Sequence, residues 1–236
     1  MESARRAFRY LFYRFIVGSL RLILTTAARV EFRSFAPLPK GAFIMASNHI
    51  SHFDPPFLSG WIRPKIDWIA MAELFGTRWS RLGFTWLDVI PVQRGGDDRQ
   101  ALREALRRLA AGHVIGVFPE GGIRDGDKSM LSGAPVRDGA VMLSTHSARP
   151  IVPVVILGSE RLYNKTYWLP WRRARVFIAT GSAIFPDTTI PRSEARERLR
   201  QEFTAAIIAL KDQLVVTCHL GPDDLPHSPQ QRMAEV

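Results

Sequence analysis

One short stretch of the chain carries a histidine and an acid that together could move a proton. His49 and Asp54 lie five positions apart, and two prolines follow at once. Near pH 7 a neutral imidazole can take a proton from a hydroxyl, while a carboxylate bonded to its other nitrogen fixes the tautomer. A five-residue offset on a continuous helix is about 140°, so the two side chains would not share a face. The pair can therefore form only if the backbone turns between the two residues.

The flanking sequence predicts that turn. An apolar run at residues 42–46 predicts a short buried strand, and Asp54 followed by Pro55 is typical of a helix start. A strand, a polar corner and a helix would place both side chains at the edge of a sheet, where binding sites are common. The alternative is that Asp54 only caps the helix and His49 is an ordinary loop residue. Both roles are compatible, because one carboxylate has two oxygens.

A glycine-rich corner follows another predicted strand. Residues 114–118 form an apolar run, and the chain continues as Pro119, Glu120, Gly121, Gly122, Ile123 and Arg124. Backbone amides at such corners can bind a phosphate, and an arginine can hold it with two parallel hydrogen bonds. Arg94, just after a third predicted strand, could converge on the same anion. The alternative is that the glycines make only a turn and Arg94 lies on the surface.

The composition indicates an anionic partner. The 236 residues include 32 lysines and arginines against 22 acids, a formal net charge of +10. Nucleic acid, anionic lipid or a phosphorylated substrate would each fit this charge. The basic residues fall mostly on predicted helices without a recognised nucleic-acid motif, so we expect no nucleic-acid partner. The single cysteine, Cys218, excludes an internal disulfide and a thiolate-based zinc cluster, and we expect no metal.

Alternating strand and helix patterns predict the fold class. They indicate an α/β fold, a single domain with a mixed, mostly parallel sheet flanked by helices. Pro153 lies inside a predicted strand, which favours an edge strand or a bulge. Along the chain we expect an N-terminal helix at residues 1–28, the α/β domain at 29–215 and a flexible polar tail at 216–236. The predicted strands are 30–33, 42–46, 65–71, 88–92, 114–118, 151–156 and 175–179, and the longer predicted helices are 5–28, 97–111, 136–147 and 194–214.

The N-terminal segment has the pattern of an amphipathic helix. Aromatic and aliphatic side chains fall on one side of residues 5–28, and Arg14 and Arg21 fall on the other. Such a helix suits the surface of an anionic membrane, and the aromatic, basic loop at residues 163–173 could join it. Both could instead pack on the core. Charged residues interrupt the apolar run, so we expect neither a secretory signal nor a simple transmembrane span.

Four motifs together resemble the glycerolipid acyltransferase family, of which 1-acylglycerol-3-phosphate acyltransferase is the type member. The four occur in the family's order across roughly residues 30–185, and a joint match is far less common by chance than any single one. They are Asn48-His49 with Asp54, the strand ending in Arg94, Phe118-Pro119-Glu120-Gly121, and the apolar strand around Pro153.

The resemblance implies a mechanism and a site. His49 would take the proton of a lysolipid hydroxyl while Asp54 orients the ring, and the oxygen would attack an acyl-CoA or acyl-carrier-protein thioester. That thioester is a co-substrate, and no other cofactor is implied. The family spacing favours His49 over His52, which would be structural or line the substrate. The implied acceptor-binding residues are Arg94, Glu120, Gly121, Gly122 and Arg124.

One departure from the family pattern concerns the acceptor. Arg124 is displaced by one position from its usual place, and Asp125 follows it. A carboxylate beside a phosphate site is repulsive, so the acceptor is either 1-acylglycerol-3-phosphate with Asp125 turned away, or a zwitterionic lysolipid such as lyso-ornithine lipid. The expected location is the cytoplasmic face of the cell membrane, held peripherally or monotopically. Rival hypotheses are an inactive lipid-binding protein at the membrane surface and a thioester hydrolase.

Overall fold

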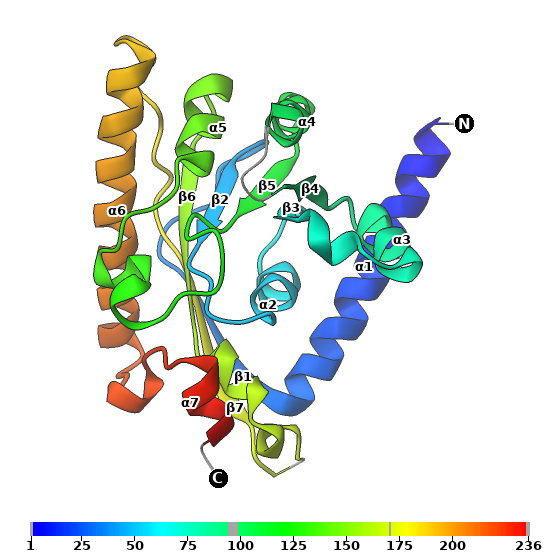
Figure 1. Cartoon of the computed structure of the whole chain (residues 1–236), viewed down its shortest axis with the longest axis vertical. Coiled ribbons are helices and arrows are strands. Elements are labelled where there is room, and N and C mark those ends of the chain that lie inside the picture. Colours follow the sequence, from blue (N-terminus) through cyan, green and yellow to red (C-terminus); the bar gives the residue numbers. More distant parts are fainter. Residues whose placement is uncertain (1, 94–98, 170, 235–236) are drawn as a thin grey trace.

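A single sheet organises the protein. The computed structural model describes residues 2–93, 99–169 and 171–234, with the side chains of residues 2–6 and 79 left aside. In this part of the chain seven strands form one sheet in the order β1-β7-β6-β2-β5-β3-β4 (Figure 1). All neighbouring strands are parallel except β6 and β7. The strands are β1 (Ala28–Ser34), β2 (Ile44–Ser47), β3 (Ile66–Met71), β4 (Ile90–Val92), β5 (Val114–Val117), β6 (Ile151–Leu157) and β7 (Ala174–Thr180).

Helices cover both faces of this sheet, as the sequence predicts. One core lies between the sheet and α4, α5 and α6, and a second lies between the sheet and α1 and α2. The helices are α1 (Glu2–Ala27), α2 (Asp54–Trp61), α3 (Arg78–Trp86), α4 (Arg99–Ala110), α5 (Gly139–Ser147), α6 (Arg192–Thr217) and α7 (Pro229–Ala234). Short 3-10 helices are η1 (Ala72–Phe75), η2 (Gly126–Lys128), η3 (Met130–Ser132), η4 (Ser159–Tyr163), η5 (Lys165–Trp168) and η6 (Pro222–Asp224).

The strand sequences explain why the sheet lies between two layers. Every residue of β2, β5 and β6 is buried, as expected of parallel strands covered on both faces. On α4, Ala101, Ala105 and Leu109 repeat at four-residue spacing and form the buried stripe. Because β2, β5 and β6 run in one direction, their carboxyl ends meet at the same sheet edge. The segments that follow these three strands therefore converge there.

The expected edge position of the proline-containing strand is wrong. β6 lies inside the sheet between β7 and β2, and Pro153 pairs with Ala46 of β2. The ladder with β7 begins only at Val154, so the missing N–H of Pro153 falls outside it. The carbonyl of Pro153 still accepts a hydrogen bond from Gly181 N at 2.9 Å. An interior strand therefore tolerates the proline at this register.

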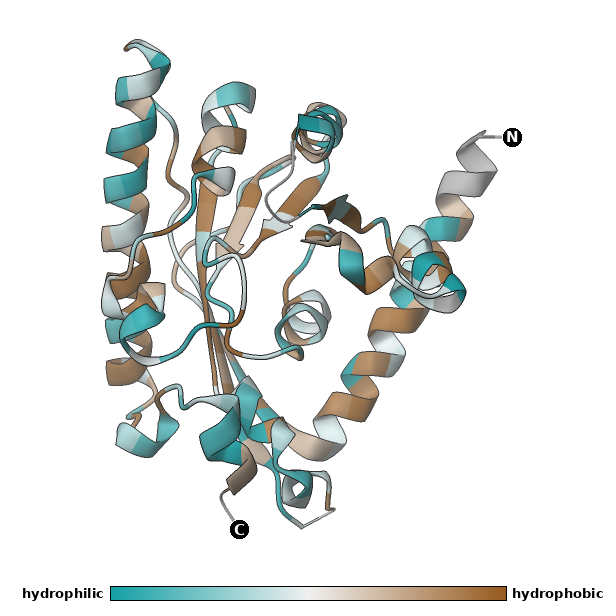
Figure 2. Ribbon diagram, in the orientation of Figure 1, coloured by the Kyte–Doolittle hydropathy of each residue, from teal (hydrophilic) through white to brown (hydrophobic). Residues whose placement is uncertain are grey.

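The N-terminal helix is long, apolar and only partly covered. α1 packs against α2, α3, β1 and η5, while several large apolar side chains on it stay exposed, including Phe15 at 71% and Leu22 at 70%. Figure 2 shows hydrophobic bands along its length. The segment Ala7–Ala27 has a mean hydropathy of 1.2 and is 17% buried, so by length and composition it could cross a membrane. The sequence analysis expects a helix lying on the surface and no simple transmembrane span, so this finding counts against the second of these expectations.

The C-terminal segment differs from the expected flexible tail. Residues 222–234 contain η6 and α7, and α7 packs against η4. Arg232 is 4% exposed and its Nε lies 3.2 Å from Oε1 of the fully buried Glu160. Asp224 accepts from Arg161 at 3.1 Å. These long-range ion pairs hold a segment whose polar composition alone suggests disorder.

Candidate active site

The histidine and the acid meet at the carboxyl end of β2. Nδ1 of His49 lies 2.8 Å from Oδ2 of Asp54, and the His49 side chain is 16% exposed. The chain turns through residues 50–53 before α2 begins at Asp54, which brings together two residues that one helix would hold apart. Asn48 anchors the turn, because its side chain exchanges two hydrogen bonds with the backbone of Ile156 at 2.8 and 2.9 Å.

The carboxylate of Asp54 is fully buried and held by protein donors on both oxygens. Oδ2 accepts the N–H groups of Ile50 at 2.8 Å and Ser51 at 2.9 Å, in addition to the histidine ring. Oδ1 accepts hydrogen bonds from the hydroxyls of Ser159 and, at 3.4 Å, Ser51. The carboxylate of Asp54 therefore binds the loop backbone and the histidine ring. It does not cap the helix, since the N-cap residue of α2 is Phe53.

A stack of rings fixes the plane of the imidazole. The ring of His49 stacks on Phe118 with centroids 4.1 Å apart and planes 20° apart. Phe118 stacks in turn on Trp68, at 4.9 Å and 7°. Nδ1 of His49 is directed to Asp54. The other ring nitrogen, Nε2, receives no hydrogen bond from any described residue. A ring held in this way can accept a proton at Nε2.

The glycine-rich corner is bonded directly to the histidine. Arg124 N donates to the His49 carbonyl at 2.9 Å, and His49 N donates to Oε2 of Glu120 at 2.5 Å. Oε1 of Glu120 accepts from Ser129 Oγ at 2.9 Å and Met130 N at 2.8 Å. Burial raises the pKa of Glu120, although these donors act in the opposite direction. Glu120 is 7% exposed and makes all these contacts with protein, so its geometry suits positioning of His49 more than contact with an acceptor.

The two glycines shape the corner beside an unforeseen arginine. Gly121 has φ +66°, and a Cβ there would collide with Nε of Arg137, so only glycine lets that side chain lie across the corner. Arg124 lies next to Gly122, with its guanidinium bonded to the Ile123 carbonyl at 3.3 Å. Arg94 falls outside the described residues. Arg124 and Arg137, which come from separate segments, thus both approach the corner.

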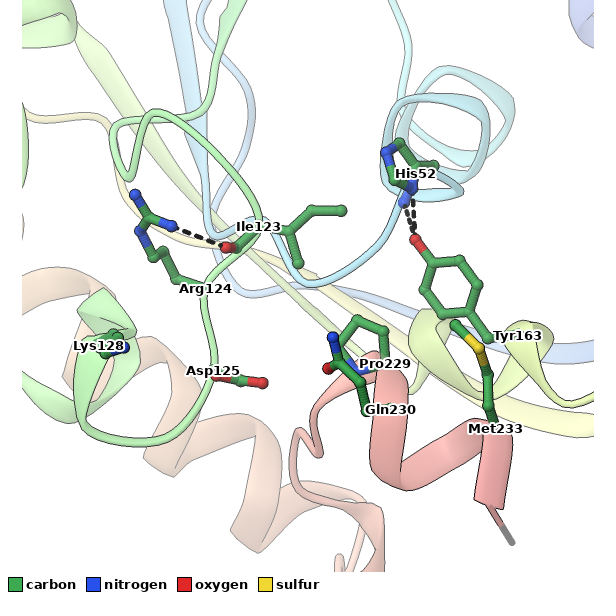
Figure 3. Close-up of a pocket in the computed structure, with 9 residues that line it drawn as sticks. All are labelled: His52, Ile123, Arg124, Asp125, Lys128, Tyr163, Pro229, Gln230 and Met233. Atoms are coloured by element: carbon green, nitrogen blue, oxygen red, sulfur yellow. Dashed lines mark hydrogen bonds between the residues drawn. The ribbon is translucent and has the colours of Figure 1, made fainter. Parts of the chain in front are cut away.

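A pocket of about 440 Å³ opens beside this corner (Figure 3). His52 and Tyr163 form one side and are bonded to each other, with the Tyr163 hydroxyl 2.5 Å from Nδ1 of His52. Burial raises the pKa of Tyr163 above its ordinary value. Its remaining lining residues are Ile123, Arg124, Asp125, Lys128, Pro229, Gln230 and Met233.

The site contains residues that sequence reasoning missed. Ser159 follows β6 and Arg137 precedes α5, and both reach the site from segments far from His49 in sequence. Neither residue stands out as a motif; only the sheet topology brings them close. Among the described residues, no cluster of three or more histidine, cysteine or acidic side chains could hold a metal.

Comparison with known proteins identifies the class of this protein. The family model described as Acyltransferase matches residues 29–157. Since this match spans more than half of the chain, the protein belongs to the acyltransferase family, as the four motifs suggest.

Two relatives have more specific names. The chain is 26% identical to a 1-acyl-sn-glycerol-3-phosphate acyltransferase of Bacillus subtilis (strain 168) over 158 residues, 65% of this chain and 76% of that protein. The crystal structure of the 1-acyl-sn-glycerophosphate (LPA) acyltransferase PlsC from Thermotoga maritima matches with a TM-score of 0.58 and 21% identity. That match covers 89% of this chain and 98% of the PlsC chain and confirms the fold.

Proposed function

We propose that this acyltransferase moves a fatty acyl group from a thioester to a free hydroxyl of a lysolipid, with His49 as general base. The observation that carries the proposal is the 2.8 Å contact between His49 and a fully buried Asp54 beside the glycine-rich corner. The second ring nitrogen takes the hydroxyl proton as the oxygen attacks the thioester carbon. Asp54 stabilises the imidazolium that forms, and the imidazolium returns the proton to the departing thiolate. No acyl-enzyme is needed.

The acceptor site is assigned to the corner next to the histidine. Gly121, Gly122 and Arg124 bind the acceptor head group, and the position of Arg137 supports a further role in charge neutralisation. Arg94 is retained from the family resemblance. Glu120 positions His49, since its carboxylate accepts a hydrogen bond from the backbone N–H of His49.

The first candidate acceptor is 1-acylglycerol-3-phosphate, giving phosphatidic acid. The name of the Bacillus relative and the arginines at the corner support it. The second candidate is a zwitterionic lysolipid such as lyso-ornithine lipid. Asp125 favours this candidate, because it lines the pocket beside Arg124. Its carboxylate would repel the second negative charge of a phosphate group bound there.

The donor and the location follow from the same proposal. Acyl-CoA or acyl-carrier protein supplies the thioester as a co-substrate, and no other cofactor takes part. The exposed apolar side chains of α1, with Trp171 at 80% exposure, support contact with the anionic cytoplasmic face of the cell membrane. Residues 1–28 then act as the membrane-interface helix of the domain at 29–215.

A panel of lysolipids tests this function. Purified protein is mixed with labelled acyl-CoA or acyl-carrier protein and, in turn, lysophosphatidic acid, lyso-ornithine lipid or no lysolipid. We expect labelled diacyl product with lysophosphatidic acid and little free fatty acid. A clear preference for lyso-ornithine lipid would replace the first candidate by the second. Free fatty acid without lipid product would indicate a hydrolase, and vesicle binding without any thiol release would indicate an inactive lipid-binding protein.

A further inference from the structure

The C-terminal helix forms one wall of the pocket beside the candidate active site. Pro229, Gln230 and Met233 of α7 line it together with His52 and Tyr163, and Met233 is drawn next to Tyr163 (Figure 3). The sequence suggests no role for this helix, and the matched family region ends at residue 157, well before it.

Buried ion pairs fix this wall relative to the histidine. Arg232 of α7 contacts the fully buried Glu160, and it also donates to the carbonyl of Asp223 at 2.9 Å. Glu160 directly follows Ser159, whose hydroxyl donates to Asp54. The 3-10 helix η4 thus holds both the wall of the pocket and the carboxylate that orients the histidine. These contacts therefore link the wall of the pocket to the reacting histidine through η4.

The lining suits a polar head group. Arg124 and Lys128 form no ion pair with any described residue, nor does Asp125. In Figure 3 the Asp125 carboxylate points toward α7, whereas the Arg124 guanidinium turns to the Ile123 carbonyl. A fatty acyl chain would cover the half-buried Arg124 and Asp125 and offer neither charge an ionic partner. The nucleotide of CoA is also phosphorylated, but it is larger and carries several negative charges, which Asp125 would repel.

We propose that α7 is the outer wall of the pocket for the polar head group of the lysolipid acceptor, and that Gln230 and Met233 limit which head groups fit. This inference rests on the proposed acyl transfer to a lysolipid. It makes the C-terminal helix a specificity element for the reaction.

Two substitutions at the wall test the proposal, with a matched control on the same helix. Gln230→Trp obstructs the pocket, Met233→Ala enlarges it, and Ala234→Trp adds the same indole at an exposed position that does not line it. Initial rates are measured against lysophosphatidic acid at saturating acyl-CoA, and then against acyl-CoA at saturating lysophosphatidic acid. Thermal unfolding of each protein confirms that it is folded.

We expect Gln230→Trp to raise KM for lysophosphatidic acid roughly tenfold, with kcat and KM for acyl-CoA near the wild-type values. Met233→Ala should raise kcat/KM for lysophosphatidylglycerol relative to lysophosphatidic acid at least about threefold. Ala234→Trp should change neither.

A shift in KM for acyl-CoA instead of KM for lysophosphatidic acid would assign the pocket to the donor. Kinetic constants that are unchanged in both wall variants would also overturn the proposal while leaving acyl transfer intact. If the wild type transfers to no lysolipid, the proposed function fails and this inference fails with it.

Discussion

Replacing Asp54 by asparagine removes a charge from the site while keeping its shape. The carboxylate is fully buried, with the histidine and two backbone N–H groups on Oδ2 and two serine hydroxyls on Oδ1. An asparagine can direct its carbonyl oxygen to the former set and its amide to the serines, whose oxygens can accept. The hydrogen-bond pattern, and with it the orientation of His49, is therefore preserved. Asp54→Asn isolates the electrostatic part of the mechanism.

The expected effect follows from when the opposite charge appears. His49 is neutral before proton transfer and positive afterwards, so the charge of Asp54 acts mainly in the transition state and should affect kcat. Losing a charge-assisted bond to a buried imidazolium costs about 2–3 kcal/mol, which is roughly a 30- to 160-fold fall in kcat. KM for the lysolipid should change little.

Thiol release from acyl-CoA, measured with and without lysolipid, gives the rate for this variant. Asp212→Asn is the matched control, because that side chain is 64% exposed and, among the described residues, its charged contact is with the neighbouring Lys211. A folded Asp54→Asn protein with kcat within threefold of the wild type would show that no imidazolium forms next to residue 54.

Three further substitutions test other parts of the structure. Burial raises the pKa of Glu120, so the native state holds this proton more tightly than the unfolded chain. Relative to Glu120→Gln, the wild-type free energy of unfolding should fall as pH rises from the ordinary glutamate pKa to the raised one; parallel pH dependences in urea titrations would contradict this. Ser159→Ala removes the one donor that reaches Asp54 from η4 and should lower kcat about three- to tenfold with KM unchanged; a pure KM effect in steady-state assays would argue against a positioning role. Arg232→Ala leaves the fully buried Glu160 without this partner and should lower the free energy of unfolding by about 3–5 kcal/mol; urea midpoints equal to the wild type would mean that the pair is not formed in solution.

Much of this fold could be predicted from the sequence, because short apolar runs and a helix start are signals contained within a few neighbouring residues. The apolar runs at β2, β5 and β6 and the helix start at Asp54 identify the elements that carry the histidine and the glycine-rich corner. The order of these elements then places their carboxyl ends together. The pairing of His49 with Asp54 could be anticipated because both residues lie within one turn of chain.

Long-range contacts account for what the sequence did not reveal. Ser159 is one serine among many, and its role depends on β6 lying next to β2 in the sheet. The polar composition after residue 216 resembles a disordered tail, yet Arg232 gains a buried partner more than 70 positions away. Pro153 reads as an edge residue because its tolerance depends on where the neighbouring ladder begins. Such features depend on tertiary register, which no window of sequence contains.

The most direct test of the account is the rate of acyl transfer from acyl-CoA to lysophosphatidic acid by His49→Ala, beside His146→Ala as a control at an exposed histidine of α5. General-base catalysis of this kind contributes roughly 10²- to 10⁴-fold, so we expect kcat to fall by about three orders of magnitude in His49→Ala and to stay at the wild-type value in the control. A folded His49→Ala protein that transfers acyl groups within tenfold of the wild-type rate would contradict the assignment of His49 as the base.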